Sequence, residues 1–323
     1  MGKASRTKQD VDRRARIAAQ REAQRRSEQR KRIYIAGGSI LVVAIVVVAF
    51  VLVKLNSGTS SGPNGPTGAA LTAVTKQVTG VPTSVTDKVA GGGVNTGIFV
   101  AATTSSAIQS ASTELGSYFA TVNGTALTSN GKPELLFLGG EYCPYCAAER
   151  WAMVNALSRF GTFTGLTATH SSTSDVYPDT PTFTFYKATY KSNYLDFTSV
   201  EEYANYRQGN SSNSSTPYVT LQTPTTAQQA LGAAYDPTGA IPFLDFGNKY
   251  VEVGNLSPLS PSMLAGKTWA QVAAAMNDPS SSLGKALVGN ANFITAGICK
   301  LTNNLPASAC TPTIQQLEAN LAV

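Results

Sequence analysis

The sequence contains few side chains that ligate metal ions, with one histidine and four cysteines in 323 residues. A structural zinc site needs four such ligands, so a zinc centre would have to use almost all of them. Charged residues make up only 14% of the chain, no segment repeats at the period of a solenoid, and 42% of the residues are hydrophobic. The sequence therefore excludes a collagen-like or wholly disordered chain and predicts one large hydrophobic core or two modest ones.

Positive charge is concentrated at the N-terminus. Residues 1–32 hold 12 Lys and Arg against 4 Asp and Glu, whereas the rest of the chain holds 13 against 15. The folded part is nearly neutral, so nucleic acid is not an expected partner. No aromatic residues interleave with the charges of the basic tail, and we interpret the tail as a topology determinant that touches anionic lipid headgroups.

An uncharged run follows the basic tail. Residues 33–53 match the roughly 20 residues that span a bilayer, whereas the apolar part of a signal peptide has about 7–15. The sequence predicts an uncleaved single-pass helix, with the N-terminus in the cytoplasm and the C-terminal domain outside. A Gly, Ser, Thr, Pro and Asn-rich segment over 54–68 predicts a flexible linker. We expect an N-terminal extension of the outer domain over 69–131 and a main domain over 132–323.

The segment Glu141-Tyr142-Cys143-Pro144-Tyr145-Cys146 lies between an apolar run over 134–138, which predicts a buried strand, and an amphipathic pattern over 146–157, which predicts a helix. Cys143 then lies at the helix N-terminus, where unpaired amides and the macrodipole favour a thiolate, and Pro144 suits the first turn. Cys146 lies one turn deeper. A disulfide that closes a two-residue loop contributes little stability, so redox chemistry is favoured over a structural role.

Strand and helix patterns continue after this helix. The predicted elements are strands over 163–169 and 182–190, helices over 199–207 and 225–235 within an insertion of about 194–240, and a hairpin over 243–246 and 249–253 around Gly247-Asn248. The proline of Ile241-Pro242 stands immediately before the hairpin and cannot donate to a ladder. That peptide is therefore predicted to be cis or placed at an edge.

Three features together resemble the thioredoxin superfamily: the strand, the Cys-Pro-Tyr-Cys at a helix start, and the Gly-x-Ile-Pro before a hairpin. The dipeptide Pro144-Tyr145 is similar to that of glutaredoxins, and the helical insertion to that of the bacterial DsbA type. The string over 141–151 also resembles an uncharacterised prokaryotic family of membrane-anchored thioredoxin-like proteins. The resemblance covers 132–323. It implies an α/β fold, a mixed sheet flanked by helices with a helical insertion, preceded here by one transmembrane helix.

The resemblance also implies roles for individual residues. Cys143 would be the nucleophile, Cys146 the resolving cysteine, and Ile241-Pro242 a cis peptide beside the sulfurs where a substrate chain pairs. Thioredoxins keep a buried acid below the motif and a tryptophan before it, and this chain departs from that pattern, which leaves its redox poise open. The neighbours that would tune the sulfurs are Glu141, Tyr142, Pro144 and Tyr145.

Two further sets of residues, one of carboxylates and one of cysteines, each have two possible roles. Glu141 and Glu149 could accept a proton from Cys146, although such carboxylates are usually solvated. Cys299 and Cys310 should be joined outside the cytoplasm, stapling a loop of about ten residues for roughly 2–3 kcal/mol. The alternative for this second pair is a redox relay to Cys146.

His170 is expected where the strand over 163–169 ends. A lone histidine is more often hydrogen-bonded or solvent-exposed than a ligand. However, Cys143, Cys146 and His170 together would suit Cu(I), and thioredoxin-fold copper chaperones for respiratory oxidases use two cysteines and one histidine. Those proteins space the cysteines by three residues instead of two, so copper handling for a membrane complex is the alternative to the main prediction.

The main prediction is a membrane-anchored, extracytoplasmic thiol–disulfide oxidoreductase that needs no cofactor. Its expected partners are exported cysteine-containing proteins, a membrane redox partner, and the bilayer through residues 33–53. The oxidising compartment favours an oxidase, although a reductase supplied by a membrane electron carrier would carry the same residues.

Overall fold

The structure, a computed structural model, describes residues 65–92, 100–101, 119–122, 124–254 and 259–319. Its centre is a seven-stranded mixed sheet with the strand order β1-β2-β13-β12-β4-β3, in which β9 also pairs with β4. The strands are β1 (Val100–Ala101), β2 (Ala120–Thr121), β3 (Thr128–Ser129), β4 (Lys132–Gly139), β9 (Asp196–Glu201), β12 (Phe243–Phe246) and β13 (Tyr250–Val253).

β4 is the strand around which the sheet is built, and it confirms the strand predicted over 134–138. It pairs in parallel with β9 and antiparallel with β12. Its residues Leu135–Leu138 are all buried, as expected for a strand covered on both faces. The predicted hairpin is also present, because β12 and β13 pair antiparallel around Gly247 and Asn248, which both have positive φ. Phe246 pairs with Tyr250, so the connection has three residues, and the second strand begins at residue 250 instead of 249.

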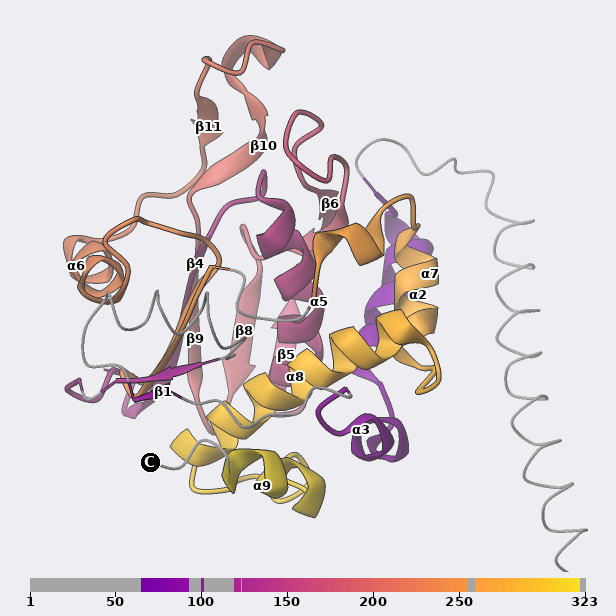
Figure 1. The fold of residues 1–323 in the computed structure, drawn as a ribbon, viewed down its shortest axis with the longest axis vertical. Coiled ribbons are helices and arrows are strands. Elements are labelled where there is room, and N and C mark those ends of the chain that lie inside the picture. The colour runs from indigo at the N-terminus through magenta and orange to yellow at the C-terminus, as the bar shows by residue number, and fades with distance from the viewer. Residues whose placement is uncertain (1–64, 93–99, 102–118, 123, 255–258, 320–323) are drawn as a thin grey trace, which may run out of the picture. The chain divides into compact units, whose positions relative to one another are not determined.

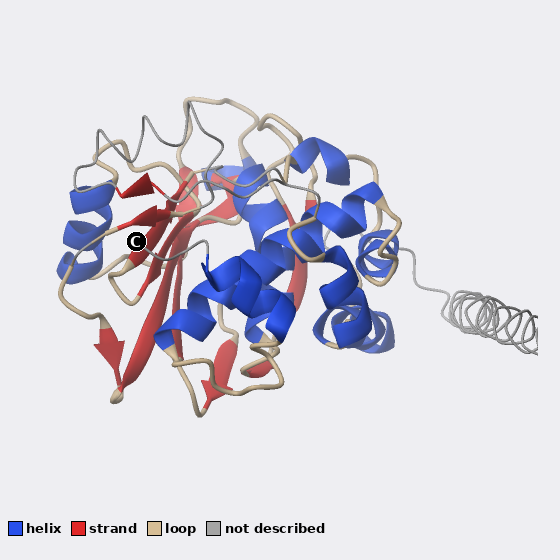
Figure 2. Ribbon diagram, turned by 60° about the horizontal axis from the view of Figure 1, so that its bottom comes forward, coloured by secondary structure: helices blue, strands red, loops and turns tan. Residues whose placement is uncertain are grey.

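Helices cover both faces of the sheet (Figures 1 and 2). Alternate residues of the strands point to opposite faces of the sheet, where they belong to two separate hydrophobic clusters. The larger cluster joins Phe137 and Leu244 to α5 and α8, and the smaller one joins Leu138 and Phe243 to α6. The helices are α2 (Gly68–Thr79), α3 (Thr83–Val89), α5 (Pro144–Leu157), α6 (Thr226–Tyr235), α7 (Trp269–Met276), α8 (Ser282–Leu301) and α9 (Pro312–Glu318).

The helix that follows the cysteine motif is more deeply buried than its sequence pattern predicts. An amphipathic helix was expected, but every residue of α5 except Tyr145 is buried. The reason is that α2, α8 and β7 (Pro181–Thr184) all pack around it. Trp151, for example, is fully buried and donates its indole N–H to the Pro181 carbonyl oxygen at 2.7 Å.

The segment between α5 and β9 corrects the predicted strands over 163–169 and 182–190. Each is divided in two, because Gly165 and Lys187 adopt positive φ values of 78° and 64°. The resulting strands form two separate two-stranded sheets instead of joining the central one. They are β5 (Gly161–Thr164) with β8 (Thr189–Ser192), and β6 (Thr167–His170) with β7.

The predicted insertion over about 194–240 is not mainly helical. The helix expected over 199–207 is wrong: that stretch belongs to β9 and β10 (Tyr203–Arg207), in keeping with the aromatic and β-branched side chains there. β10 pairs with β11 (Tyr218–Thr220) as a projecting hairpin, with a short 3-10 turn over Gln208–Asn210. Only the helix expected over 225–235 is confirmed, as α6, whose N-terminus is closed by a capping box between Thr225 and Gln228.

The N-terminal predictions fall largely beyond the part of the chain just described. The basic tail (1–32), the membrane helix (33–53) and the linker up to residue 64 lie outside the described residues. Within the described ranges, none of the helices has the length and apolar character to cross a bilayer. In the predicted extension over 69–131, β2 and β3 join the central sheet.

Candidate functional site

The two cysteines of the motif lie where β4 passes into α5. The chain leaves the sheet after Gly139, turns, and enters the helix with Cys143 as the N-cap and Pro144 as the first helical residue. The Cys143 sulfur accepts the backbone N–H of Cys146 at 3.4 Å. The predicted position of Cys143 at a helix N-terminus is therefore what the backbone shows, with an amide donor aimed at its sulfur.

The two thiols are free but not equivalent. Cys143 retains 6% of its surface, whereas Cys146 retains none, so only Cys143 can be reached from solvent. The pKa of Cys143 is lowered, first by a hydrogen bond from the Cys146 side chain and then by the Cys146 N–H and the positive charge of Arg150, which outweigh burial. Burial raises the pKa of Cys146 well above its usual value, and the neighbouring Cys143 adds to that effect. Cys143 is therefore the more acidic and more accessible sulfur.

The loop before β12 lies directly beside Cys143. The Ile241-Pro242 peptide bond is cis, and the Cys143 thiol donates to the Ile241 carbonyl oxygen at 3.7 Å. The sheet register explains this proximity, because Phe243 pairs with Leu138 at the end of β4 from which the motif departs. The fold therefore brings Cys143 and Cys146 together with the Ile241-Pro242 peptide.

A buried ion pair beneath the motif was missed by the sequence analysis. Arg150, which is 0% exposed, donates through Nε and Nη2 to the two carboxylate oxygens of Glu201 at 2.8 and 2.6 Å. Its Nη2 also donates to the carbonyl oxygen of Gly140, at 2.8 Å. Glu201 reaches this position because β9 pairs in parallel with β4, which places it opposite Gly139. The pair thus links the loop before the cysteines to the neighbouring strand and places a positive charge behind them.

Glu141 belongs to the same buried group and is not solvated. It is 8% exposed, and its backbone N–H donates to the Tyr203 carbonyl oxygen at 2.8 Å. Burial raises the pKa of Glu141, while a hydrogen bond with Thr184 and the charge of Arg150 oppose the rise. Glu141 is therefore an acid that burial keeps closer to its neutral form, next to the loop that carries the two cysteines.

Two tyrosines of the motif contact projecting segments on either side. Tyr142 stacks on Tyr218 of the β10–β11 hairpin with ring centroids 4.4 Å apart, and Tyr145 meets Tyr177 edge-on at 6.1 Å. The same two segments expose apolar surface. In the described part of the chain, the exposed large hydrophobic side chains there are Val176, Tyr177, Tyr203 and Tyr206, and only Leu305 is exposed elsewhere. In Figure 1 the β10–β11 hairpin and the loop after β6 project side by side at the top.

His170 is not joined to the sulfurs in a ligand set. Its Nδ1 lies 2.7 Å from the Ser171 carbonyl oxygen and 3.2 Å from the Asp179 carboxylate. Its strand, β6, pairs with β7 and does not belong to the central sheet that carries the cysteine motif. Among the described residues, no three His, Cys, Asp or Glu side chains are grouped so that they could hold a metal ion.

Glu149 lies deeper in the molecule than expected for a solvated carboxylate. It is 2% exposed and accepts a hydrogen bond from Asn290 of α8 at 2.8 Å. Burial raises the pKa of Glu149 to about 7. Glu252 on β13, also fully buried, has a pKa raised well above its usual value by burial and by the charge of Glu149. These two acids form a buried carboxyl pair between α5, α8 and the sheet.

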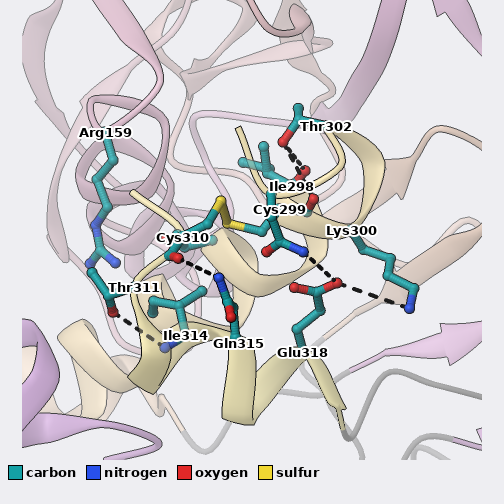
Figure 3. Close-up of a disulfide and its surroundings, with 12 residues drawn as sticks. Arg159, Ile298, Cys299, Lys300, Thr302, Cys310, Thr311, Ile314, Gln315 and Glu318 are labelled. Carbon is teal, nitrogen blue, oxygen red and sulfur yellow. Dashed lines mark hydrogen bonds and ion pairs between the residues drawn. A yellow bond between two sulfur atoms is a disulfide. The ribbon is translucent and has the colours of Figure 1, made fainter. Parts of the chain in front are cut away.

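The second cysteine pair is bonded. Cys299 and Cys310 form a disulfide between the end of α8 and the start of α9, with their Cα atoms 5.8 Å apart (Figure 3). Gln315 donates to the Cys310 carbonyl oxygen at 2.9 Å, which ties the staple to α9. Figure 1 places α9 at the bottom and the β10–β11 hairpin, which contacts Tyr142, at the top. This separation gives the relay alternative no structural support.

Comparison with known proteins assigns the chain to a family. Residues 118–300, more than half of the sequence, match the family model described as "Domain of unknown function (DUF929)". The chain belongs to this family. The DUF929 match includes both motif cysteines, the Arg150–Glu201 pair and the Ile241-Pro242 loop. No curated protein and no solved structure matches the chain.

Proposed function

We propose that this DUF929 protein is a membrane-anchored, extracytoplasmic thiol–disulfide oxidoreductase with a thioredoxin-like domain, acting on exported cysteine-containing proteins. The observation that carries the proposal is the unequal thiol pair at the start of α5, with Cys143 accessible and acidified and Cys146 fully buried. The anchor is the uncharged run over 33–53, and the expected regenerating partner is a membrane redox protein.

The sheet supports a thioredoxin-like interpretation. In the order β9-β4-β12-β13, the strand before the motif pairs in parallel with β9 and antiparallel with β12, which continues into a hairpin. α5 and α8 pack on one face and α6 on the other. This arrangement is compatible with what the resemblance implies, a mixed sheet flanked by helices with a strand before the Cys-x-x-Cys and a hairpin after the Ile-Pro.

The unequal acidities favour different roles for the two sulfurs in thiol–disulfide exchange. In the oxidising direction, a substrate thiolate attacks the Cys143 sulfur of a Cys143–Cys146 disulfide, the bond between the two protein sulfurs breaks, and Cys146 leaves with the electron pair and takes up a proton. A second substrate thiolate then attacks the substrate sulfur of the mixed disulfide, and Cys143 leaves as a thiolate. The substrate has lost two electrons and the protein has gained two, which the membrane redox partner removes.

The lowered pKa of Cys143 supports the oxidising direction in particular. A thiol with a lower pKa leaves faster and stabilises the reduced form of the pair. The exposed tyrosines on both sides of the motif support a polypeptide substrate, because an unfolded exported chain offers apolar side chains that could cover them.

Trapping of mixed disulfides tests the proposal. The full-length Cys146→Ser protein should accumulate adducts with exported proteins that a reductant releases, because its Cys143 thiolate can still attack a disulfide of an exported protein while Cys146 is no longer there to break the mixed disulfide that forms. The Cys143→Ser/Cys146→Ser variant is the matched control and should trap nothing. The proposal is overturned if the two variants give the same result. Stoichiometric Cu(I) binding by the reduced protein that weakens in His170→Ala would instead favour the copper-handling alternative.

A further inference from the structure

A cavity lies beside the Ile241-Pro242 loop, on the face of the sheet that α6 covers. Its volume is about 240 Å³. Leu138, Phe243 and Ile241 supply apolar walls, Gly232 of α6 also lines the cavity, and Glu202 and Asp236 supply carboxylates. Pockets for drug-sized ligands range from about 300 to 1,000 Å³, so this one suits a single side chain better than a cofactor.

One residue, Ile241, lies between the cavity and the Cys143 sulfur. Ile241 lines the cavity, and its carbonyl oxygen lies 3.7 Å from the Cys143 sulfur. Consecutive residues of an extended chain are about 3.3–3.6 Å apart along its axis. A polypeptide whose cysteine meets Cys143 while its backbone runs past Ile241 can therefore place a side chain one or two residues away in the cavity.

The charges around the cavity are of one sign. Glu202 and Asp236 line it, and none of its described lining residues is Lys, Arg or His. Asp236 is engaged, since its carboxylate accepts from Thr238 and from the Ala240 N–H. The Glu202 carboxylate, in contrast, is half-buried and makes no hydrogen bond or ion pair within the described part of the chain, and burial raises its pKa. A cation placed in the cavity would stabilise the charged form of Glu202.

We propose that this cavity is a specificity subsite that takes a lysine or arginine side chain close to the cysteine on which Cys143 acts. The apolar walls would contact the aliphatic part of that side chain, and Glu202 would pair with its charged end. This inference rests on the proposed function, because it names the substrate class of the same site.

Matched peptides test the subsite. Exchange rates of the full-length protein in detergent are measured with three extended peptides that differ only two residues from their single cysteine, where they carry Lys, Ala or Glu. The Lys peptide should react about three- to fivefold faster than the Ala peptide, the gain expected of a half-exposed ion pair, and the Glu peptide should react slowest. In Glu202→Gln, the ratio of the Lys rate to the Ala rate should fall to about one.

The control variant is Glu134→Gln. It removes one partly buried carboxylate near the opposite end of β4, so the preference for the Lys peptide should persist. Equal rates for the three peptides, or a preference that survives Glu202→Gln, would overturn the subsite while leaving the oxidoreductase proposal standing. Absence of exchange with every peptide would overturn both.

Discussion

The two cysteine pairs occupy opposite kinds of environment in one fold. Cys143 and Cys146 are free thiols at the start of a helix, with one sulfur reachable and the other fully buried. Cys299 and Cys310 are both buried and joined, between the end of one helix and the start of the next. In the first pair, hydrogen bonds from Cys146 lower the pKa of Cys143 and burial raises the pKa of Cys146, whereas the second pair closes a loop. Cysteine content alone therefore does not assign a role, but local backbone position does.

The charges near the two pairs also differ. Behind the first pair, Arg150 and Glu201 are both 0% exposed and bonded to each other. Beside the second pair, Lys300 and Glu318 lie 4.0 Å apart, and the lysine side chain is 43% exposed. An exposed pair of this kind contributes at most about 1 kcal/mol, whereas a charge left alone by breaking a buried pair costs about 3–5 kcal/mol. The first pair therefore lies in the region where single substitutions have large electrostatic effects.

The largest expected effect comes from the reachable sulfur. Cys143→Ser should abolish thiol–disulfide exchange with a model peptide, because the hydroxyl cannot form the mixed disulfide. Cys299→Ser/Cys310→Ser should retain the wild-type rate. Equal losses in the two variants would remove the distinction between the pairs.

The next prediction concerns the buried ion pair of Arg150 and Glu201. It gives the size of the change in stability and the direction of the change in the pKa of Cys143. Arg150→Met should lower the free energy of unfolding by about 3–5 kcal/mol, because Glu201 stays buried without a partner. It should also raise the pKa of Cys143, whereas Glu201→Gln should lower it further, because it leaves the positive charge uncompensated. The pH profile of Cys143 alkylation measures both. Arg150→Lys, which keeps the charge, is the control, and shifts of the same sign in the Met and Gln variants would contradict the electrostatic role.

A smaller effect is the pH dependence of stability that the buried Glu149 should cause. Because the pKa of Glu149 is raised from about 4.5 to about 7 in the folded protein, its stabilising contribution is complete below pH 4.5 and is lost as the pH rises through 7. Wild-type stability should therefore fall, on the order of 3 kcal/mol, across this window, and Glu149→Gln should flatten the fall. Urea unfolding at pH 4.5, 6 and 8 provides the comparison. An unchanged slope in the Gln variant would assign the pH dependence to other groups.

The smallest effect concerns the disulfide between Cys299 and Cys310. Removing both sulfurs in Cys299→Ser/Cys310→Ser should lower the free energy of unfolding by about 2–3 kcal/mol, the chain entropy of a loop of this length. The reduction potential of the Cys143–Cys146 pair should not move. A shifted potential would revive the relay between the two pairs.

Local patterns predicted the elements whose evidence is contiguous in sequence. β4, the start of α5, the hairpin around Gly247-Asn248 and the Cys299–Cys310 staple each depend on residues close along the chain. The predictions were wrong where a strand pairs with residues far away in the sequence. The strand predicted over 163–169 is divided between β5 and β6 outside the central sheet, and the strand that pairs in parallel with β4 is β9.

The candidate site shows the same division. The motif residues and the Ile241-Pro242 loop were found from sequence, whereas Arg150 has the sequence context of an ordinary helix-surface charge. It is buried because β9 brings Glu201 to it from 51 residues away. The one signal that could have drawn attention to it is a helix of mostly apolar or small residues with only two charged positions, Glu149 and Arg150. Its partner could not have been identified without the parallel register of β4 and β9.

The measurement that tests the central claim most directly is the reduction potential of the Cys143–Cys146 pair in the full-length protein. A redox-active pair with an acidified Cys143 should equilibrate reversibly with a glutathione buffer at about −200 mV or above, the range of proteins that donate disulfides. A pair that stays oxidised until below about −300 mV would behave as a structural disulfide and contradict the account.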